Sequence, residues 1–251
     1  MKQGDLVKYL ERLLRNQDFK DASQNGLQVD GDREVRKVAF AVDACLASFR
    51  DAVRVGAQML IVHHGMYWDK PVLPVGADYR RLKVLLDAGV SLYASHLPLD
   101  AHPKLGNNAE LCRLLGLRKR HAFGEYHGQH IGFAGEFSTA TTLDRVVARL
   151  RKATGSEPLK VFRNGPKRVK KVGCISGGAA GMWDHAEKAG YDTYVTGEGG
   201  HGNFHPIVEH NVNVIFGGHY ATETLGLKAL QQHLAKKFKL STAFIDLPTG
   251  M

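Results

Sequence analysis

The sequence predicts an α/β protein in which two α/β halves each carry a largely parallel or mixed sheet. Short apolar runs of strand length alternate with longer segments whose apolar residues recur at helical spacing. Strands that alternate with helices in this way form mostly parallel sheets. Polar side chains also follow several of the apolar runs directly, where open α/β sheets place their ligand sites.

The first half begins with a helix over residues 5–16, where leucines recur at helical spacing and Asp5 is a candidate N-cap. The next apolar run, residues 35–42, is continuous, as expected of a strand with both faces covered. A loop is expected at 96–100, after the last strand of this half. The remaining elements are strands at 59–62 and 90–95 and helices at 44–55, 78–88 and 107–115.

The second half repeats the alternation after a joining region near residues 117–130, which predicts domains over 1–125 and 126–251. Thr141 or Thr142 is suited to cap the first helix of this half. Strands are predicted at 128–137, 169–175, 193–196, 212–216 and 242–245, and helices at 142–153, 182–189 and 221–235.

The overall composition is that of a globular protein with a basic surface. The chain has 251 residues, 43% of them hydrophobic and 24% charged. Its 34 Lys and Arg residues outnumber 25 Asp and Glu residues, which gives a net charge of +9. A basic surface favours anionic partners such as nucleotides or nucleic acid. Because the basic residues are scattered, an ordinary solvated surface is the favoured interpretation.

Cysteine spacing and hydropathy indicate the compartment. Cys45, Cys112 and Cys174 are widely spaced and odd in number, which argues against a disulfide scaffold or a zinc ribbon and suggests small buried side chains. The first residues lead into an amphipathic segment and not a signal peptide. No apolar run approaches the about 20 residues of a membrane span. We therefore expect a cytoplasmic protein with no membrane partner.

The chain contains 13 histidines, which prompts a search for metal ligands. His63 and His64 follow the apolar run at 59–62. Adjacent side chains of an extended strand point to opposite sides, so this pair would hold two neighbouring ions more easily than one. The alternatives are a polar pair at a strand end, or one ligand beside a packed ring.

A histidine and a carboxylate also stand four residues apart at the start of a predicted helix. His219 and Glu223 face the same way if the helix begins near His219. Gly217 and Gly218 allow a sharp turn before it. The alternative is that Glu223 only complements the positive end of the helix dipole.

Asp100 lies in the loop that follows the strand at 90–95, where Pro98 stiffens the backbone. A carboxylate at this place can bind or bridge metal ions, or it can cap a turn. His96 and His102 flank Asp100, and either can support a ligand or hold a substrate.

The five candidate ligands, without His96 and His102, offer three imidazoles and two carboxylates. Mixed nitrogen and oxygen donors suit zinc, iron, manganese, cobalt or nickel and do not suit a calcium cage. Five protein ligands leave open positions on two ions, which is typical of catalytic sites. We predict two divalent transition-metal ions bound by His63, His64, Asp100, His219 and Glu223.

Two further segments can contribute to a site. Residues 177–181 are rich in glycine and lie between a strand and a helix, where they either present N–H groups to an anion or form a tight turn. Glu198 can orient a ligand or act as a base. Near it, His201 and His205 are further candidates, and His205 can contact a substrate phosphate.

Five stretches of the chain resemble the Nif-three-like dinuclear metal-centre family, often labelled GTP cyclohydrolase I type 2. They are residues 25–29, 62–65, 95–100 with 106–108, 196–198 and 218–223. The resemblance is to the short bacterial members, which lack an inserted domain, and it implies two interlocked α/β domains and a toroidal homohexamer built as a trimer of dimers. It also implies the metal-ligand role for the five residues above. The basic region 118–129 matches no motif of the family.

The leading functional hypothesis is a metal-dependent hydrolase that acts on a nucleotide-like anion. The resemblance implies GTP as substrate, with ring opening and release of formate. Glu198 or His96 would then move protons. One alternative is a metal-containing ring with a regulatory role or one in binding nucleic acid. A smaller alternative is phosphoester hydrolysis at the same site.

Overall fold

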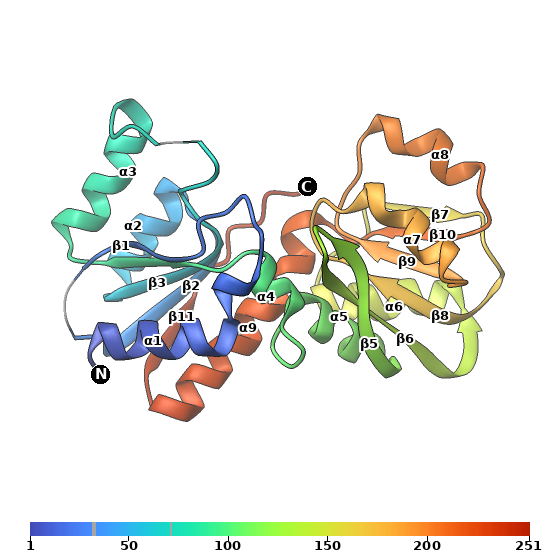
Figure 1. The fold of residues 1–251 in the computed structure, drawn as a ribbon, viewed down its shortest axis with the longest axis horizontal. Helices are drawn as coiled ribbons and strands as arrows, with labels where there is room; N and C mark the ends of the chain where they lie inside the picture. The colour runs from blue at the N-terminus through green and yellow to red at the C-terminus, as the bar shows by residue number, and fades with distance from the viewer. Residues whose placement is uncertain (32–33, 71) are drawn as a thin grey trace. The chain divides into compact units, whose positions relative to one another are not determined.

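The computed structural model describes residues 1–31, 34–70 and 72–251. The chain forms two compact units, each with its own sheet (Figure 1). Unit 1 contains Met1–Leu99 and Leu227–Leu247, and unit 2 contains Asp100–Gly226 and Pro248–Met251. This division differs from sequential halves that meet at residue 125. Asp100 belongs to unit 2, and the second part of the last helix and the last strand belong to unit 1, because the final strand pairs with the first unit's sheet.

The sheet of unit 1 has the strand order β1-β4-β3-β2-β11. Its strand pairings are parallel except at β1, which runs antiparallel to β4. In Figure 1, α2 and α3 cover one face of this sheet, while α1 and the second part of α9 cover the other. The strands are β1 (Gly26–Val29), β2 (Lys37–Asp43), β3 (Met59–His64), β4 (Ser91–Ala94) and β11 (Ser241–Phe244). The helices are α1 (Gln3–Leu14), α2 (Leu46–Arg54), α3 (Gly76–Asp87) and α9 (His219–Phe238).

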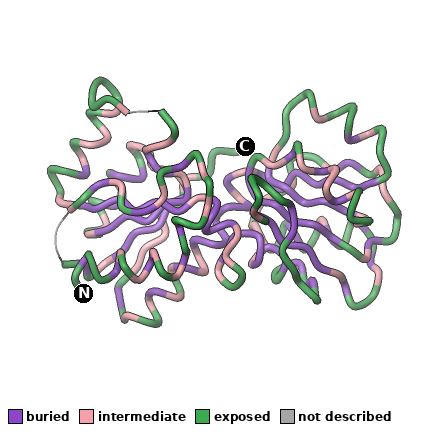
Figure 2. Tube along the Cα trace, viewed as in Figure 1, coloured by how far each residue is buried: buried purple, intermediate pink, exposed green. Residues whose placement is uncertain are grey.

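Coverage of both faces explains why β2 and β3 are continuously apolar. Ala39 and Ala41 pack with Phe49 of α2 and Leu85 of α3 in one cluster, so alternate residues of β2 face these helices. The residues between them, including Phe40, are equally buried on the opposite face. Figure 2 shows this burial along the inner strands of each sheet. The apolar run at 35–42 therefore predicted a strand with two covered faces correctly.

The sheet of unit 2 has the order β5-β6-β8-β9-β10-β7. Strands β8, β9 and β10 are parallel, whereas β5, β6 and β8 pair antiparallel and β7 is antiparallel to β10. Helices α5 and α6 share a core with the sheet through residues such as Leu111 and Val146. The strands are β5 (Arg118–Tyr126), β6 (Gln129–Thr142), β7 (Lys160–Arg163), β8 (Arg168–Cys174), β9 (Thr193–Thr196) and β10 (Asn213–Phe216). The helices are α4 (Leu97–Ala101), which ends in this unit, α5 (Asn107–Leu115), α6 (Leu143–Thr154), α7 (Trp183–Lys188) and α8 (Phe204–Val208).

The joining region expected at 117–130 is instead a long hairpin of β5 and β6. Its turn consists of His127 and Gly128, both with positive φ, which is the backbone of a tight two-residue hairpin turn. Most side chains of β5 are exposed and many are basic, so no apolar run revealed this strand. The short elements β1, β7 and α8 were likewise not predicted.

Smaller expectations also changed. The loop expected at 96–100 is largely the short helix α4, which begins at Leu97 and has Pro98 in its first turn, where the missing N–H of proline does no harm. Asp5 lies inside α1 and not at its cap, which is Lys2. Thr142 caps α6 by accepting a hydrogen bond from the Arg145 N–H, as predicted.

The prediction of small buried cysteine side chains holds for two of the three cysteines. Cys112 and Cys174 are buried free thiols, and Cys45 is a partly exposed one. Among helices of the described residues, none is long and apolar enough to cross a membrane.

Candidate metal centre

In unit 1, three histidines gather at the C-terminal ends of β3 and β4. His63 and His64 are the last two residues of β3, and His96 follows β4 after one residue. One ring nitrogen of each lies within 4.8 Å of the others. Because β3 ends here, the two neighbouring rings do not diverge as an ideal strand would require, and their centroids are 4.7 Å apart. The expectation that His63 and His64 point to opposite sides is therefore wrong.

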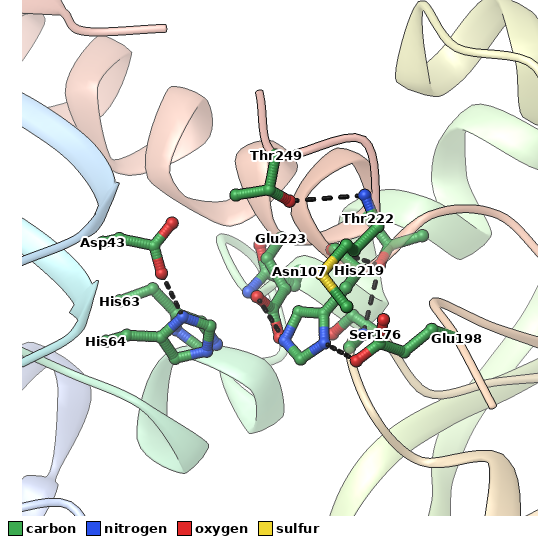
Figure 3. A network of polar contacts seen from close by, with 12 residues as sticks. Asp43, His63, His64, Asn107, Ser176, Glu198, His219, Thr222, Glu223 and Thr249 are labelled. Carbon is green, nitrogen blue, oxygen red and sulfur yellow. Dashed lines mark hydrogen bonds and ion pairs between the residues drawn. The ribbon is translucent and has the colours of Figure 1, made fainter. Parts of the chain in front are cut away.

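The register of the sheet supplies a carboxylate for His64. Asp43, the last residue of β2, lies directly opposite His64 in the parallel pair. Its Oδ1 is 2.9 Å from His64 Nδ1 (Figure 3). A carboxylate on one ring nitrogen holds the ring in place and orients the other nitrogen, Nε2, as a metal ligand.

His63 is completely buried and uses a backbone partner instead. Its Nδ1 is 3.0 Å from the carbonyl oxygen of Ser95. A carbonyl only accepts hydrogen bonds, so Nδ1 carries the proton and Nε2 carries the lone pair that binds metals. The fold thus fixes both the orientation and the tautomer of His63.

His96, like His64, has a carboxylate partner, which is Asp21. Its Nδ1 is 2.9 Å from Asp21 Oδ1, and the backbone N–H groups of His96 and Leu97 donate to Asn25 and Asp21. Burial raises the pKa of Asp21, but hydrogen bonds from His96 and Asn25 and the charge of His96 outweigh it and lower that pKa to about 2. Asp21 is therefore a carboxylate at neutral pH. His96, predicted as a catalytic residue, lies in the same cluster as two predicted ligands.

In unit 2, the predicted pair His219 and Glu223 is in contact. His219 begins α9, and its Nε2 is 3.2 Å from Glu223 Oε2 one turn later. Its Nδ1 is 2.8 Å from Glu198 Oε1 (Figure 3), so the predicted catalytic Glu198 orients this ring. Gly218, with φ of +92°, makes the turn that brings His219 to the helix start.

Gly177 lies against this pair. Its φ is +67°, and a Cβ at this position would overlap Glu223 Oε1 and lie 3.3 Å from His219 Nε2. Its N–H donates to Thr222 Oγ1, and its carbonyl accepts from the N–H groups of Gly197 and Glu198. The N–H of Gly177 is therefore engaged within the fold, and this part of the 177–181 segment is a tight turn that makes room for the His219 and Glu223 side chains.

Asp100 is a buried carboxylate held by two side-chain donors. Its Oδ1 accepts from Asn107 Nδ2 and from Ser176 Oγ, each at 2.9 Å. Asn107 in turn accepts from the Gly226 N–H of α9, and Asn108 accepts from the Ser176 N–H. Residues 106–108 therefore connect Asp100 to the segments that carry Gly177 and Glu223.

Of the other candidates, His102 accepts hydrogen bonds at Nδ1 from the N–H groups of Lys104 and Leu105, so it stabilises a turn. His201 and His205 line a cavity of about 680 Å³ that also contains Glu198. Sequence reasoning missed three residues that form hydrogen bonds to the predicted site residues: Asp21, Asp43 and Ser176. An aspartate at the end of β2, one strand away from His64, was the available signal for Asp43.

The cavity beside Glu198 has an aromatic wall. Phe162 packs edge-on against Phe204 and Phe216, with ring centroids 5.8 and 5.4 Å apart. The Lys160 ammonium lies 5.7 Å from the centroid of Phe162 and 5.9 Å from that of Phe204. Phe204 remains 42% exposed, so its ring is available to a ligand.

The donors of each unit suit a metal ion of intermediate softness. Unit 1 offers imidazoles whose Nδ1 atoms are engaged by Ser95, Asp43 and Asp21. Unit 2 offers His219 in contact with the Glu223 carboxylate, while Asp100 accepts hydrogen bonds from Asn107 and Ser176. The histidine and glutamate groups of the described residues can thus hold a metal ion.

Comparison with known proteins places the chain in a family. The model of the family Duf34/NIF3 (NGG1p interacting factor 3) matches residues 1–249. The chain is 43% identical to a Pyrococcus horikoshii protein named GTP cyclohydrolase 1 type 2 homolog, over all of both chains. A Deinococcus radiodurans protein of the same name is 40% identical, over 98% of this chain and 94% of its own length. The crystal structure of TTHA1606 from Thermus thermophilus superimposes with a TM-score of 0.90 at 45% identity, with full coverage of both chains. The chain therefore belongs to the DUF34/NIF3 family.

Proposed function

We propose that this protein is a hydrolase with two divalent transition-metal ions bound by His63, His64, Asp100, His219 and Glu223. The observation that carries the proposal is the fixed orientation of the histidines. The Nδ1 atoms of His63, His64 and His219 lie 2.8 to 3.0 Å from an acceptor oxygen, which makes Nε2 the candidate ligand atom of each ring.

Bound ions would lower the pKa of a coordinated water and polarise a substrate oxygen. The chain's own residues prepare this chemistry. Asp43 and Asp21 hold the rings of His64 and His96 in place, and the low pKa of Asp21 keeps it charged. His96 and Glu198 are the groups we assign to proton transfer, because both carry nitrogen or oxygen atoms beside the proposed ligands.

The substrate class that we propose is a nucleotide-like anion, with GTP as the specific candidate. The cavity beside Glu198 supports this choice, because aromatic side chains stack on nucleobases and Lys160 favours an anion. The curated relatives are named as homologs of GTP cyclohydrolase 1 type 2. In that reaction water adds to C8 of guanine, the C8–N9 bond breaks, and hydrolysis of the resulting formamide releases formate.

The test is formate release from GTP with added manganese, zinc or iron, together with metal content by elemental analysis. We expect His64→Ala and Glu223→Gln to lose metal and turnover. His130→Ala, a substitution of an exposed histidine, is the matched control and retains both. Metal-independent turnover, or turnover equal in all four proteins, would contradict the proposed function.

The aromatic cavity has its own test. Replacing Phe204 with Ala removes a stacking surface, and base–aromatic stacking contributes about 1–3 kcal/mol. We therefore expect KM for GTP to rise about tenfold while kcat changes little. Tyr126→Ala is the control, because Tyr126 is 44% exposed and lies outside this cavity. An equal KM for both variants would remove the cavity from the substrate site.

We also propose that the protein assembles as a homohexamer, a trimer of dimers, as the family resemblance implies. Native mass spectrometry at micromolar concentration tests this directly. A species of six chains supports the proposal, and a monomer or dimer at all concentrations contradicts it.

A further inference from the structure

Unit 2 contains a second cavity, of about 890 Å³, that none of the candidate metal-centre residues lines. Helices α5 and α6 and the strands β5, β6 and β8 contribute to its wall. Its floor includes the buried side chains of Leu115, Phe137 and Thr141. Its volume is within the about 300–1,000 Å³ range of small-molecule sites.

The lining of this cavity is strongly cationic. It contains six basic residues and no carboxylate: Arg113, Arg118, Arg145, Arg149, Lys152 and Arg168. Arg113 forms an ion pair with Glu110 on the same helix. Within the described residues, no ion pair is found for the other five. Like charges around one concave volume repel each other and concentrate an attractive field for anions.

Two of the guanidinium groups are held in place by the fold. Arg149 donates from Nη1 to the carbonyl oxygen of Leu115 at 2.8 Å, and its Cζ lies 5.0 Å from the centroid of the Phe137 ring. Arg168 donates from Nη2 to the carbonyl oxygen of Ala140 at 2.5 Å. A guanidinium has five N–H donors, so each group retains donors for a ligand. Fixing the side chains beforehand lowers the entropic cost of binding.

Gly116 allows the close approach of Arg149. It ends α5 with φ of +81°, and a Cβ there would lie 3.1 Å from Arg149 Nη1. Ser138, Thr139 and Thr141 add hydroxyl groups to the same cavity. The lining thus combines rigid guanidinium forks, a flexible ammonium and hydroxyl donors, which together match phosphate oxygens.

We propose that this cavity binds a small anion that carries several phosphate groups, at a site separate from the candidate metal residues. A single phosphate would leave most of the five uncompensated cations unpaired, whereas a chain of linked phosphates carries enough negative charge to pair with several of them. The concave shape favours a small molecule over nucleic acid, which tracks extended basic surfaces. The proposal does not depend on the function proposed above.

The probe is inorganic triphosphate, titrated calorimetrically into the full chain at constant ionic strength. The test variant is Arg145→Gln with Lys152→Gln, since both residues are exposed and no ion pair is found for either among the residues described. The two substitutions remove charged hydrogen-bond donors from the cavity, so we expect affinity to fall at least about tenfold. Lys8→Gln with Arg12→Gln on α1 changes the net charge equally and is the matched control.

Three outcomes decide the proposal. Loss of triphosphate binding in the α6 variant, with binding retained in the α1 control and in Glu223→Gln, supports it. Equal weakening in both charge variants shows attraction by net charge alone and overturns it. Absence of triphosphate binding to the wild type, together with binding of a 20-base-pair DNA that the α6 variant loses, also overturns it, in favour of nucleic acid. As a check on folding, the α6 variant without anion should melt at or above the temperature of the wild type, because repulsion is relieved.

Discussion

Asp43 lies opposite His64 across the parallel pair of β2 and β3, and its Oδ1 is 2.9 Å from His64 Nδ1. The contact joins the ends of two neighbouring strands, so the sheet register itself orients a candidate metal ligand. Removing this contact leaves the proposed ligand in place but frees its ring to rotate.

Replacing Asp43 with Asn therefore should weaken metal binding without unfolding the chain. Loss of the carboxylate partner of a metal-binding histidine lowers affinity by about 10–100-fold. Competition with a chromophoric chelator measures this change. Asp87→Asn is the control, because Asp87 pairs with Lys83 on exposed α3. Unchanged affinity in the Asp43 variant would show that His64 needs no such support.

Replacing Gly177 with Ala should destabilise the fold around His219 and Glu223. The added methyl meets Glu223 in a left-handed backbone conformation, and such strain costs about 1–3 kcal/mol. Urea unfolding gives the change in free energy of unfolding. Gly178→Ala is the control, since its Cβ would lie at an ordinary 3.7 Å from His219 Cε1. Equal effects of the two substitutions would show that the close approach at Gly177 is unimportant.

Replacing Asn107 with Ala should cost about 1–3 kcal/mol of stability, because it leaves buried polar groups without their partner. Asn107 is fully buried, donates to Asp100 and accepts from the Gly226 N–H. Urea unfolding again measures the loss, with the exposed Asn211→Ala as control. A change as small as that of the control would mean that the hydrogen bonds of Asn107 contribute little to the free energy of unfolding.

The free energy of unfolding should fall as the pH drops below 6.5, in part through His233. Burial and the charge of Lys237 lower the pKa of His233 below its ordinary 6.5, and its Nε2 lies 2.5 Å from the Tyr9 hydroxyl. A lowered histidine pKa contributes stability that is present above pH 6.5 and is lost as pH falls through the folded-state value.

Thermal melts of wild type and His233→Gln between pH 5 and 8 measure this contribution, with the exposed His130→Gln as control. The His233 variant should lose less stability on acidification than the control does. Parallel pH profiles for the two variants would exclude His233 as the titrating group.

The sequence was informative where local pattern and burial agree. The continuous apolar run before His63 predicted β3, and the spacing of His219 and Glu223 predicted one face of α9. The strand β5 escaped prediction because its side chains are mostly exposed and charged. The partners of the histidines escaped for a different reason. Asp43 and Asp21 reach their rings only through strand register and loop packing, which a linear pattern does not contain.

The division into two units also could not be predicted from local sequence patterns. A boundary at residue 125 follows if each segment folds with its neighbours in the sequence. In the structure β11 instead pairs with β2, about 200 residues earlier in the chain. Local sequence patterns contain no information about pairing over such a distance. For the same reason Asp100, expected in the first half, belongs to unit 2.

Because β11 pairs with β2, the sheet of unit 1 cannot be completed until the end of the chain has been synthesised. A ribosome exposes β1 to β4 early, yet the edge of β2 opposite β3 stays unpaired until residues 241–244 leave the exit tunnel. Until then the nascent first unit presents an unpaired parallel edge, the kind of surface that invites wrong pairing with other chains. Unit 2, most of whose residues form one continuous segment, is able to mature while the first unit still waits for its last strand.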